Sequence, residues 1–370
     1  MQPHAGSARL FPLDALRGLL MVLMALDHAN YFIARQHSSG EYWGGPFPTY
    51  PDATAFLARL VTHLAAPGFF FLMGAGMLLL ARARRAAGWS RWAVARFFLL
   101  RGALLIALKL LVVNRAWGLY GSGWGYIGVL FALGACMLLG AALVWLRPGY
   151  LLALSAALAL AVEWLTPDPG RWGQAFPALM RILFVPGPGR ALWVNYPVLP
   201  WLGLTALGMA FGGWLAGDAR HAFRHALWLG AAMLLAFLAL RALDGFGNLR
   251  PRAGETWIDF LNAVKYPPSL VFTLMTMGPN LILLGLLARA GERLQRVLQP
   301  LVVLGQSPLF FYVTHLFLYA GLGLELAPGG TSIPGMLPYW LLGLLLLFPL
   351  CWWYGRLKQR QPAHSILRLF

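Results

Sequence analysis

Ionisable side chains inside apolar runs are the residues of this sequence best suited to chemistry. The stretch Leu13–Ala29, LDALRGLLMVLMALDHA, carries Asp14, Arg17, Asp27 and His28. Such groups cost about 2.5–3.5 kcal/mol each in the middle of a membrane helix, so a functional role is the first expectation for them. Asp14, Arg17 and His28 share one face of a helix, and Asp14 and Arg17, one turn apart, predict an ion pair.

Two further histidines lie in other apolar runs. His63 belongs to THLAAPGFFFLMGAG and His315 to SPLFFYVTHLFLY. At the helical rise of about 1.5 Å per residue, His28 and His315 lie about 22 Å from the inner boundary of the membrane core. His63 lies about 10 Å from the outer boundary. In a core about 30 Å thick, all three histidines are therefore expected at a similar depth. A histidine transfers protons at neutral pH, and Asp27 or Glu163 could orient one. We therefore predict one histidine site beneath the outer surface.

Basic residues form a second group, near the opposite boundary. Arg82, Arg84 and Arg85 occupy a short turn, and Arg96 and Arg101 lie in the apolar run that follows. Arg101 at mid-membrane needs an anionic partner, either a carboxylate of another helix or a bound phosphate. The histidines show no metal-ligand spacing, so the sequence predicts no metal site.

The composition places all these residues in a membrane domain. Of 370 residues, 59% are hydrophobic and 11% charged, against about 25% charged in soluble domains, and the mean hydropathy is +0.66. Runs of about 20 apolar residues span a bilayer. We predict an all-α integral membrane protein, with residues 1–370 forming one domain that has a core at 9–355 and a short basic tail at 356–370. Its ten or so transmembrane helices, packed in one bundle, are expected at 13–34, 56–81, 92–113, 125–146, 150–166, 197–216, 226–243, 269–289, 299–325 and 336–355.

Charge sets the expected orientation. The net charge is +17, carried by 26 Arg and 3 Lys against 12 Asp and Glu. Short basic turns join the spans on one face, which is typical of the cytoplasmic side, and both termini are predicted there, in the inner membrane. The excess positive charge follows from this topology and would attract anionic lipid rather than nucleic acid. Small-residue pairs, Gly74 with Gly76 and Gly134 with Gly140, suit close helix packing.

Five blocks in order resemble one family. They are LDALRGLLMVLMALDHA, THLAAPGFFFLMGAG, YPVLPWLGLTALGMAFG (196–212), KYPPSLVFTLMTMGP (265–279) and SPLFFYVTHLFLY (307–319). Together they look like the bacterial branch of the heparan-alpha-glucosaminide N-acetyltransferase catalytic-domain family, within the transmembrane acyltransferase superfamily. The resemblance extends over about residues 9–355. Its most specific part is the Asp-x-x-Arg-Gly opening followed by a histidine.

The resemblance implies a membrane-bound O- or N-acyltransferase. Such enzymes pass an acyl group from cytoplasmic acetyl-CoA or another acyl-CoA to an amino sugar or glycan outside, with a histidine involved. Asp14 and Arg17 match the opening motif, and His28 and His63 match the bacterial histidine positions. In the lysosomal branch the catalytic histidine lies beyond the first span, which brings it closer to His37. The acceptor is not named by the resemblance.

On this hypothesis the roles divide between the two ends of the bundle. The basic turns would hold the phosphates of acyl-CoA, and His28 or His63 would act as general base or carry the acyl group. Thr62 or Tyr312 could stabilise the oxyanion. The tryptophans of the long outer loops would offer stacking surfaces to a sugar, namely Trp43, Trp172 and Trp193.

Two other readings use the same residues. A proton-coupled secondary transporter would employ the intramembrane Asp, Arg and His as a relay, although no inverted repeat is visible in the sequence. A non-catalytic membrane scaffold would not explain why three histidines are expected at one depth. The sequence leaves the oligomeric state open, with a homo-oligomer as one option.

Overall fold

The computed structural model describes residues 10–38, 40–121, 125–189, 191–361 and 365. This part of the chain is almost entirely helical, and its only strands are two residues long, β1 (Tyr126–Ile127) and β2 (Trp193–Val194). The predicted all-α fold is confirmed. The last residues of the predicted basic tail, 362–364 and 366–370, lie outside the described residues.

Eight helical stretches in the described residues are long and apolar enough to cross a membrane. Two of them are composite, because the chain deviates from a regular α-helix partway along. The eight consist of α2 (Ala53–Thr62) with α3 (Ala65–Ala86), α4 (Arg91–Leu108) with a π-helical segment (Lys109–Val113) and α5 (Asn114–Gly118), α7 (Pro148–Leu165), α9 (Val198–Leu215), α10 (Ala219–Leu243), α12 (Leu270–Leu287), α15 (Pro308–Leu326) and α16 (Ile333–Arg360).

Two more helices coincide with predicted spans. The first, α1 (Phe11–Ala29), runs on into a π-helical segment (Asn30–Ala34) and carries three charged residues, and α6 (Val129–Leu143) is 15 residues long. The chain is thus a multi-pass membrane protein, and the total of ten spans stays a prediction. The remaining helices are short: α8 (Ala178–Leu183), α11 (Trp257–Leu261), α13 (Glu292–Val297), α14 (Gln299–Gly305) and a 3-10 turn (Pro169–Arg171).

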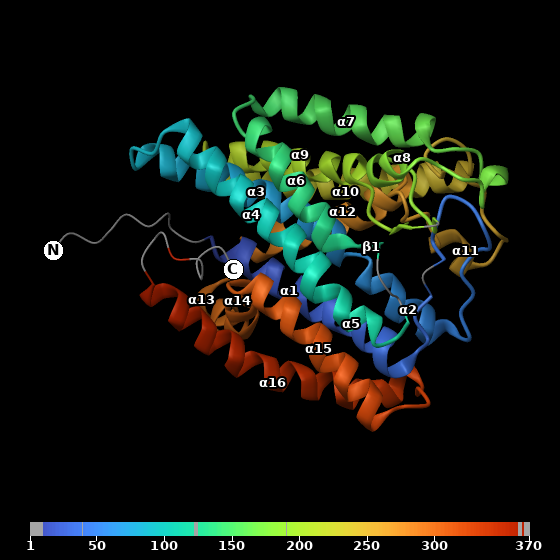
Figure 1. The fold of residues 1–370 in the computed structure, drawn as a ribbon. Coiled ribbons are helices and arrows are strands. Elements are labelled where there is room, and N and C mark those ends of the chain that lie inside the picture. Colours follow the sequence, from blue (N-terminus) through green and yellow to red (C-terminus); the bar gives the residue numbers. More distant parts are fainter. Residues whose placement is uncertain (1–9, 39, 122–124, 190, 362–364, 366–370) are drawn as a thin grey trace.

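The helices pack in pairs around α9. This helix is almost wholly buried, with α3 and α7 against it, while α4 packs on α6, α10 on α12 and α1 on α14. Figure 1 shows α7 and α16 along opposite edges of the bundle, and it places the start of α1 and the end of α16 near α13 and α14 at one end. β1, α2 and α11 lie at the other end, which we call the loop end.

Glycines let the buried helices approach backbone to backbone. A Cβ added at Gly74 of α3 would lie 2.0 Å from the Thr205 carbonyl oxygen of α9, and one at Gly134 would lie 2.6 Å from the Gly102 carbonyl oxygen. Close backbone approach of this kind is how small residues stabilise helix pairs in a bilayer. Gly76 has open space around its Cβ position, so of the expected Gly74–Gly76 pair only Gly74 makes such a contact.

Gly74→Ala is expected to destabilise the protein by about 1–3 kcal/mol, because the new methyl group must push α3 and α9 apart. Thermal unfolding in detergent measures the change. Gly76→Ala, two residues along the same helix, is the matched control and should leave the unfolding temperature unchanged, since nothing lies within 4 Å of its added Cβ. Equal unfolding temperatures for the two variants would contradict this packing.

Candidate active site

Two helix irregularities at the loop end position the polar residues. The α1 helix ends after its π-helical segment, where Arg35 adopts a left-handed conformation with φ 57°. The chain then turns back, which brings His37 to the same end as His28. The second span breaks at His63, between α2 and α3. Pro67 has no N–H to donate to the His63 carbonyl, which accounts for the break.

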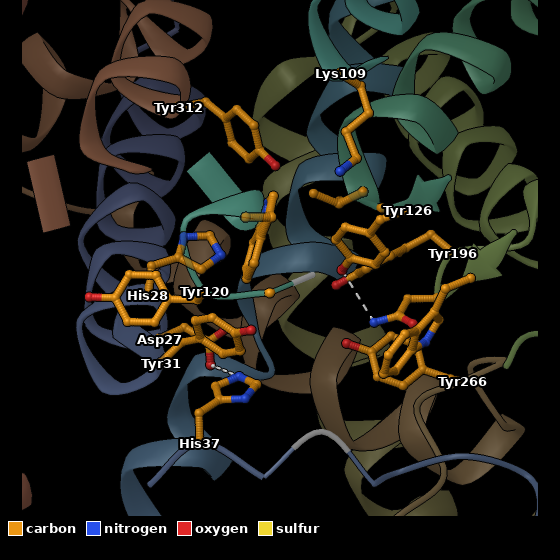
Figure 2. Close-up of a pocket in the computed structure, with 16 residues that line it drawn as sticks. Asp27, His28, Tyr31, His37, Lys109, Tyr120, Tyr126, Tyr196, Tyr266 and Tyr312 are labelled. Carbon is orange, nitrogen blue, oxygen red and sulfur yellow. Dashed lines mark hydrogen bonds and ion pairs between the residues drawn. The ribbon is translucent and has the colours of Figure 1, made fainter. Parts of the chain in front are cut away.

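A cavity of about 320 Å³ lies among these segments. Figure 2 shows His28, Asp27 and Tyr31 from α1 and its extension, with His37 below them and Tyr126, Tyr196 and Tyr266 on the far side. Aromatic side chains make most of its wall. Its lining consists of Asp27, His28, Tyr31, His37, Lys109, Trp117, Tyr120, Gly121, Tyr126, Gly128, Val129, Trp193, Asn195, Tyr196, Tyr266 and Tyr312.

His28 and His315 meet at this cavity. His28 Nδ1 lies 2.6 Å from His315 Nε2, and both rings are buried. His315 is fixed from behind, because its Nδ1 lies 2.9 Å from the Phe311 carbonyl oxygen, which can only accept. With neutral rings, His315 Nδ1–H therefore donates to Phe311, and His315 Nε2 accepts from His28 Nδ1–H.

This hydrogen-bond chain fixes the tautomer of His28. Its Nε2 carries no proton and makes no hydrogen bond within the described residues. The ring also forms part of the cavity wall. His28 Nε2 is thus a lone pair available to a ligand, which is the requirement for a general base or a nucleophile.

Asp27, next to His28, belongs to a separate cluster. Arg59 Nη1 and the Thr62 hydroxyl both donate to Asp27 Oδ1, each at 2.7 Å. His37 Nε2 lies 3.2 Å from that same oxygen and 2.8 Å from Arg59 Nη1. His37 Nε2 therefore faces a donor and an acceptor at once, and its Nδ1 is buried without a partner. Unlike His28, His37 has no tautomer imposed by its neighbours.

Glu41 completes the cluster from the loop after α1. Arg59 Nε and Nη2 donate to its two carboxylate oxygens at 2.6 and 3.0 Å, a bidentate pair. Burial raises the pKa of the Glu41 carboxyl, but the Arg59 guanidinium outweighs it and brings this pKa to about 2. Burial, reinforced by Arg59, lowers the pKa of the nearby Lys265 to about 8. Both remain charged near neutral pH, so two carboxylates, Asp27 and Glu41, balance two cations, Arg59 and Lys265.

The remaining predicted residues of the loop end take structural positions. His63 lies 3.6 Å from Glu41 Oε1 and packs on Phe272, away from the cavity and from the His28–His315 pair. Glu163 accepts from the backbone N–H of Leu270 at 2.8 Å, so it orients the start of α12 rather than a histidine. The Thr62 hydroxyl is committed to Asp27.

Of the loop tryptophans, only Trp193 lines the cavity. Trp43 is 1% exposed and packs against Trp172, so both help to build the loop end. The parallel pairing of β1 with β2 sets Trp193 opposite Tyr126. A hydrogen-bonded path then links Trp193 to Tyr126 through the Tyr42 hydroxyl and Asn195, at 2.9, 2.5 and 3.2 Å. This path makes a rigid aromatic wall.

The predicted ion pair forms at the opposite end of α1. Arg17 Nη1 donates to Asp14 Oδ1 at 2.8 Å and to the Gly305 carbonyl oxygen at 3.1 Å. Arg101 lies near Arg17 and Tyr354. Its Nε is buried without a hydrogen-bond partner, and no carboxylate contacts it in the described part of the chain. Asp14 thus pairs with Arg17, while the Arg101 guanidinium has no carboxylate partner among the described residues, an arrangement that suits an additional anion.

The other predicted basic residues lie on the surface at the same end. Arg82 donates to the Gly213 carbonyl oxygen at 3.4 Å, and Arg85 to the Trp89 carbonyl oxygen at 2.6 Å. Arg84 stacks over the Trp89 ring, and Arg96 is exposed. They form a cationic surface rather than a closed pocket with Arg101.

Sequence reasoning did not single out Arg59, Glu41 or Lys265 as site residues. Arg59 lies within an apolar run, which was an available signal, because a charge there needs a partner. Glu41 and Lys265 come from loops and are brought together by the fold, with the Lys265 backbone N–H donating to the Glu41 carbonyl oxygen at 2.9 Å. No spacing in the sequence connects them.

The fold and the cavity define a class: an all-α, multi-pass membrane protein with a histidine-lined cavity inside its bundle. Among the described residues, no group of three or more His, Cys, Asp or Glu could hold a metal ion. The model of the family described as "heparan-alpha-glucosaminide N-acetyltransferase, catalytic" matches residues 9–243, more than half of the chain. The chain belongs to this family of membrane acetyltransferases. No curated protein matches it.

Proposed function

We propose that the protein transfers an acetyl or other acyl group from cytoplasmic acyl-CoA to an amino sugar or glycan on the other side of the inner membrane. The observation that carries this proposal is the unprotonated His28 Nε2 at the wall of the cavity. Family membership supports the acetyl transfer, and the aromatic wall with Trp193 and Tyr126 is the kind of surface on which sugars stack.

His28 acts as general base in this proposal. The acceptor amine or hydroxyl attacks the thioester carbonyl carbon while His28 Nε2 takes its proton; the C–S bond breaks, and CoA leaves as a thiolate that is then protonated. His315 keeps the Nδ1 proton on His28 and accepts its hydrogen bond as the imidazolium forms. His37, held by Asp27 and Arg59 at the same cavity, is the alternative base, and acylation of His28 Nε2 is the covalent alternative.

The acyl-CoA donor would reach the cavity from the end of the bundle opposite the loop end, which is the predicted cytoplasmic side. Arg101, which has no carboxylate partner among the described residues, would bind phosphate groups inside the bundle beside Arg17, and the surface arginines would gather the polyanion from the cytoplasm. The acyl arm would then lie along α1, whose length connects Arg17 with His28. This route for the donor requires both termini to lie on the cytoplasmic side, as the charge distribution predicts.

The test is transfer by the purified full-length protein in nanodiscs. We expect radiolabel from acetyl-CoA to appear on at least one member of a panel of amino sugars and envelope glycans, with release of CoA. Arg101→Met should raise KM for acetyl-CoA about tenfold or more, as loss of a charged hydrogen bond does, with little effect on KM for the acceptor. Absence of CoA release and of labelled product across the panel would contradict the proposal, and proton-coupled uptake of a solute into vesicles would favour a transporter.

A further inference from the structure

Lys109 is the charged residue of the cavity wall that the proposed chemistry does not use. It lies in the π-helical segment after α4, and its side chain is 1% exposed. The ammonium group donates to the Asn114 side-chain oxygen and lies 4.0 Å from the centre of the Tyr126 ring. No carboxylate contacts it among the described residues. Figure 2 shows its nitrogen pointing toward the middle of the cavity, apart from His28 and Asp27.

The charges around the cavity explain why Lys109 stands out. Asp27, Glu41, Arg59 and Lys265 cancel one another, as described above. In its protonated form Lys109 then adds one positive charge without a counter-charge, against the aromatic side chains of the cavity. A buried ammonium group without a paired anion is costly, so an anion placed within its reach would bind favourably.

We propose that Lys109 binds an anionic substituent of the acceptor, a carboxylate or a phosphate ester on the sugar, while the amine or hydroxyl to be acylated faces His28. This inference rests on the proposed acyl transfer. The aromatic wall between the two residues, with Trp117 and Tyr126, would carry the faces of the sugar ring. Lys109 is therefore a specificity-determining residue that selects acidic amino sugars.

The donor phosphates are a poorer match for Lys109. The residue lies 18 positions beyond Arg91, where α4 begins, which is about 27 Å along the helix. Arg101 lies eight positions before Lys109, about 12 Å toward the start of α4, and its Nε is buried without a hydrogen-bond partner. The phosphates of a donor that enters from the start of α4 would therefore meet Arg101 first. The same cavity brings Lys109 together with His28, so the anion it binds belongs to the molecule that His28 deprotonates.

Three acceptors of one sugar series test the inference: glucosamine, glucosamine 6-phosphate and muramic acid, which carries a carboxylate. Wild-type protein should acylate at least one anionic acceptor with a kcat/KM about tenfold or more above that of glucosamine. Lys109→Met should lower that value by about 10–100-fold and leave glucosamine within about threefold, and Lys109→Arg should retain the preference. A wild-type preference for glucosamine, or an equal loss on all three acceptors, would overturn the inference.

Binding without turnover separates this inference from the proposed function. Calorimetric titration of the full-length protein with glucosamine 6-phosphate and with muramic acid, in the absence of acyl-CoA, should give binding by wild type and by Lys109→Arg that Lys109→Met loses. Such binding without any transfer would support the anion site and count against acyl transfer. Anion binding that is unaffected by Lys109→Met, or no anion binding to wild type, would overturn the anion site even where glucosamine is acylated.

Discussion

His28→Gln is expected to lower kcat for acyl transfer by about 10²–10⁴-fold, the usual contribution of a positioned general base. Glutamine has similar length and can hydrogen-bond to His315, but it offers no basic lone pair at the position of Nε2. The measurement is single-turnover transfer from radiolabelled acetyl-CoA to the best acceptor of the panel, with KM values for both substrates.

The neighbouring histidines supply matched controls. His63→Gln changes a histidine of the Glu41 cluster that does not line the cavity, and its kcat should remain within about tenfold of wild type. His37→Gln keeps a hydrogen-bonding group between Asp27 and Arg59 and should cost less than His28→Gln. A larger loss for His37→Gln than for His28→Gln would contradict His28 as the base and assign that role to His37.

His315 is a positioning residue, because it acts through His28. His315→Phe removes the acceptor for His28 Nδ1–H and frees both tautomers, whereas His315→Gln retains an acceptor oxygen. We expect the phenylalanine variant to lose activity and the glutamine variant to recover most of it. A group that merely filled space would show the opposite order, since the Phe311 and Tyr312 rings around His315 would accommodate another ring more readily than an amide.

The features that could be predicted from the sequence are those with a regular spacing along a helix. Apolar runs of membrane length marked each of the long helices, because burial in lipid requires continuous hydrophobicity over a fixed length, and most ends agree to within about seven residues. The prediction of one span over 299–325 was wrong, because the chain turns after α14 and α15 begins only at Pro308. The Asp14–Arg17 contact was predictable for the same reason, since residues one turn apart always face one another.

The sequence could not predict which polar groups meet across the bundle. The apolar runs predicted a similar depth for His28, His63 and His315, although α15 begins at Pro308, only seven residues before His315. Depth in any case leaves the direction around each helix axis unspecified. The structure joins His28 to His315 and turns His63 toward Glu41. That separation follows from the α2–α3 break at His63 and from the loop that carries Glu41 to Arg59, neither of which has a periodic signal.

Arg59→Met is expected to lower the free energy of unfolding by about 3–5 kcal/mol, because it leaves the buried Glu41 carboxylate and the half-buried Asp27 carboxylate without their cation. The Arg59 side chain is 1% exposed, and it holds Glu41 through two hydrogen bonds and Asp27 through one. Lys265 alone would then face both carboxylates. Thermal and denaturant unfolding of the full-length protein in detergent measures the change.

Arg220→Met is the matched control for loss of an arginine, since Arg220 is exposed and its truncation should change stability by no more than about 0.5 kcal/mol. The double variant Arg59→Met/Glu41→Met removes one of the stranded carboxylates as well as the guanidinium. It should be more stable than Arg59→Met alone, because exchanging both members of a buried ion pair for apolar groups costs less than removing one. A double variant less stable than the single one, or equal small effects for Arg59→Met and Arg220→Met, would show that the cluster does not hold the loop after α1 against α2.

His37 and Asp27 depend on that attachment, so loss of the Arg59 cation should also weaken transfer, even though Arg59 does not line the cavity.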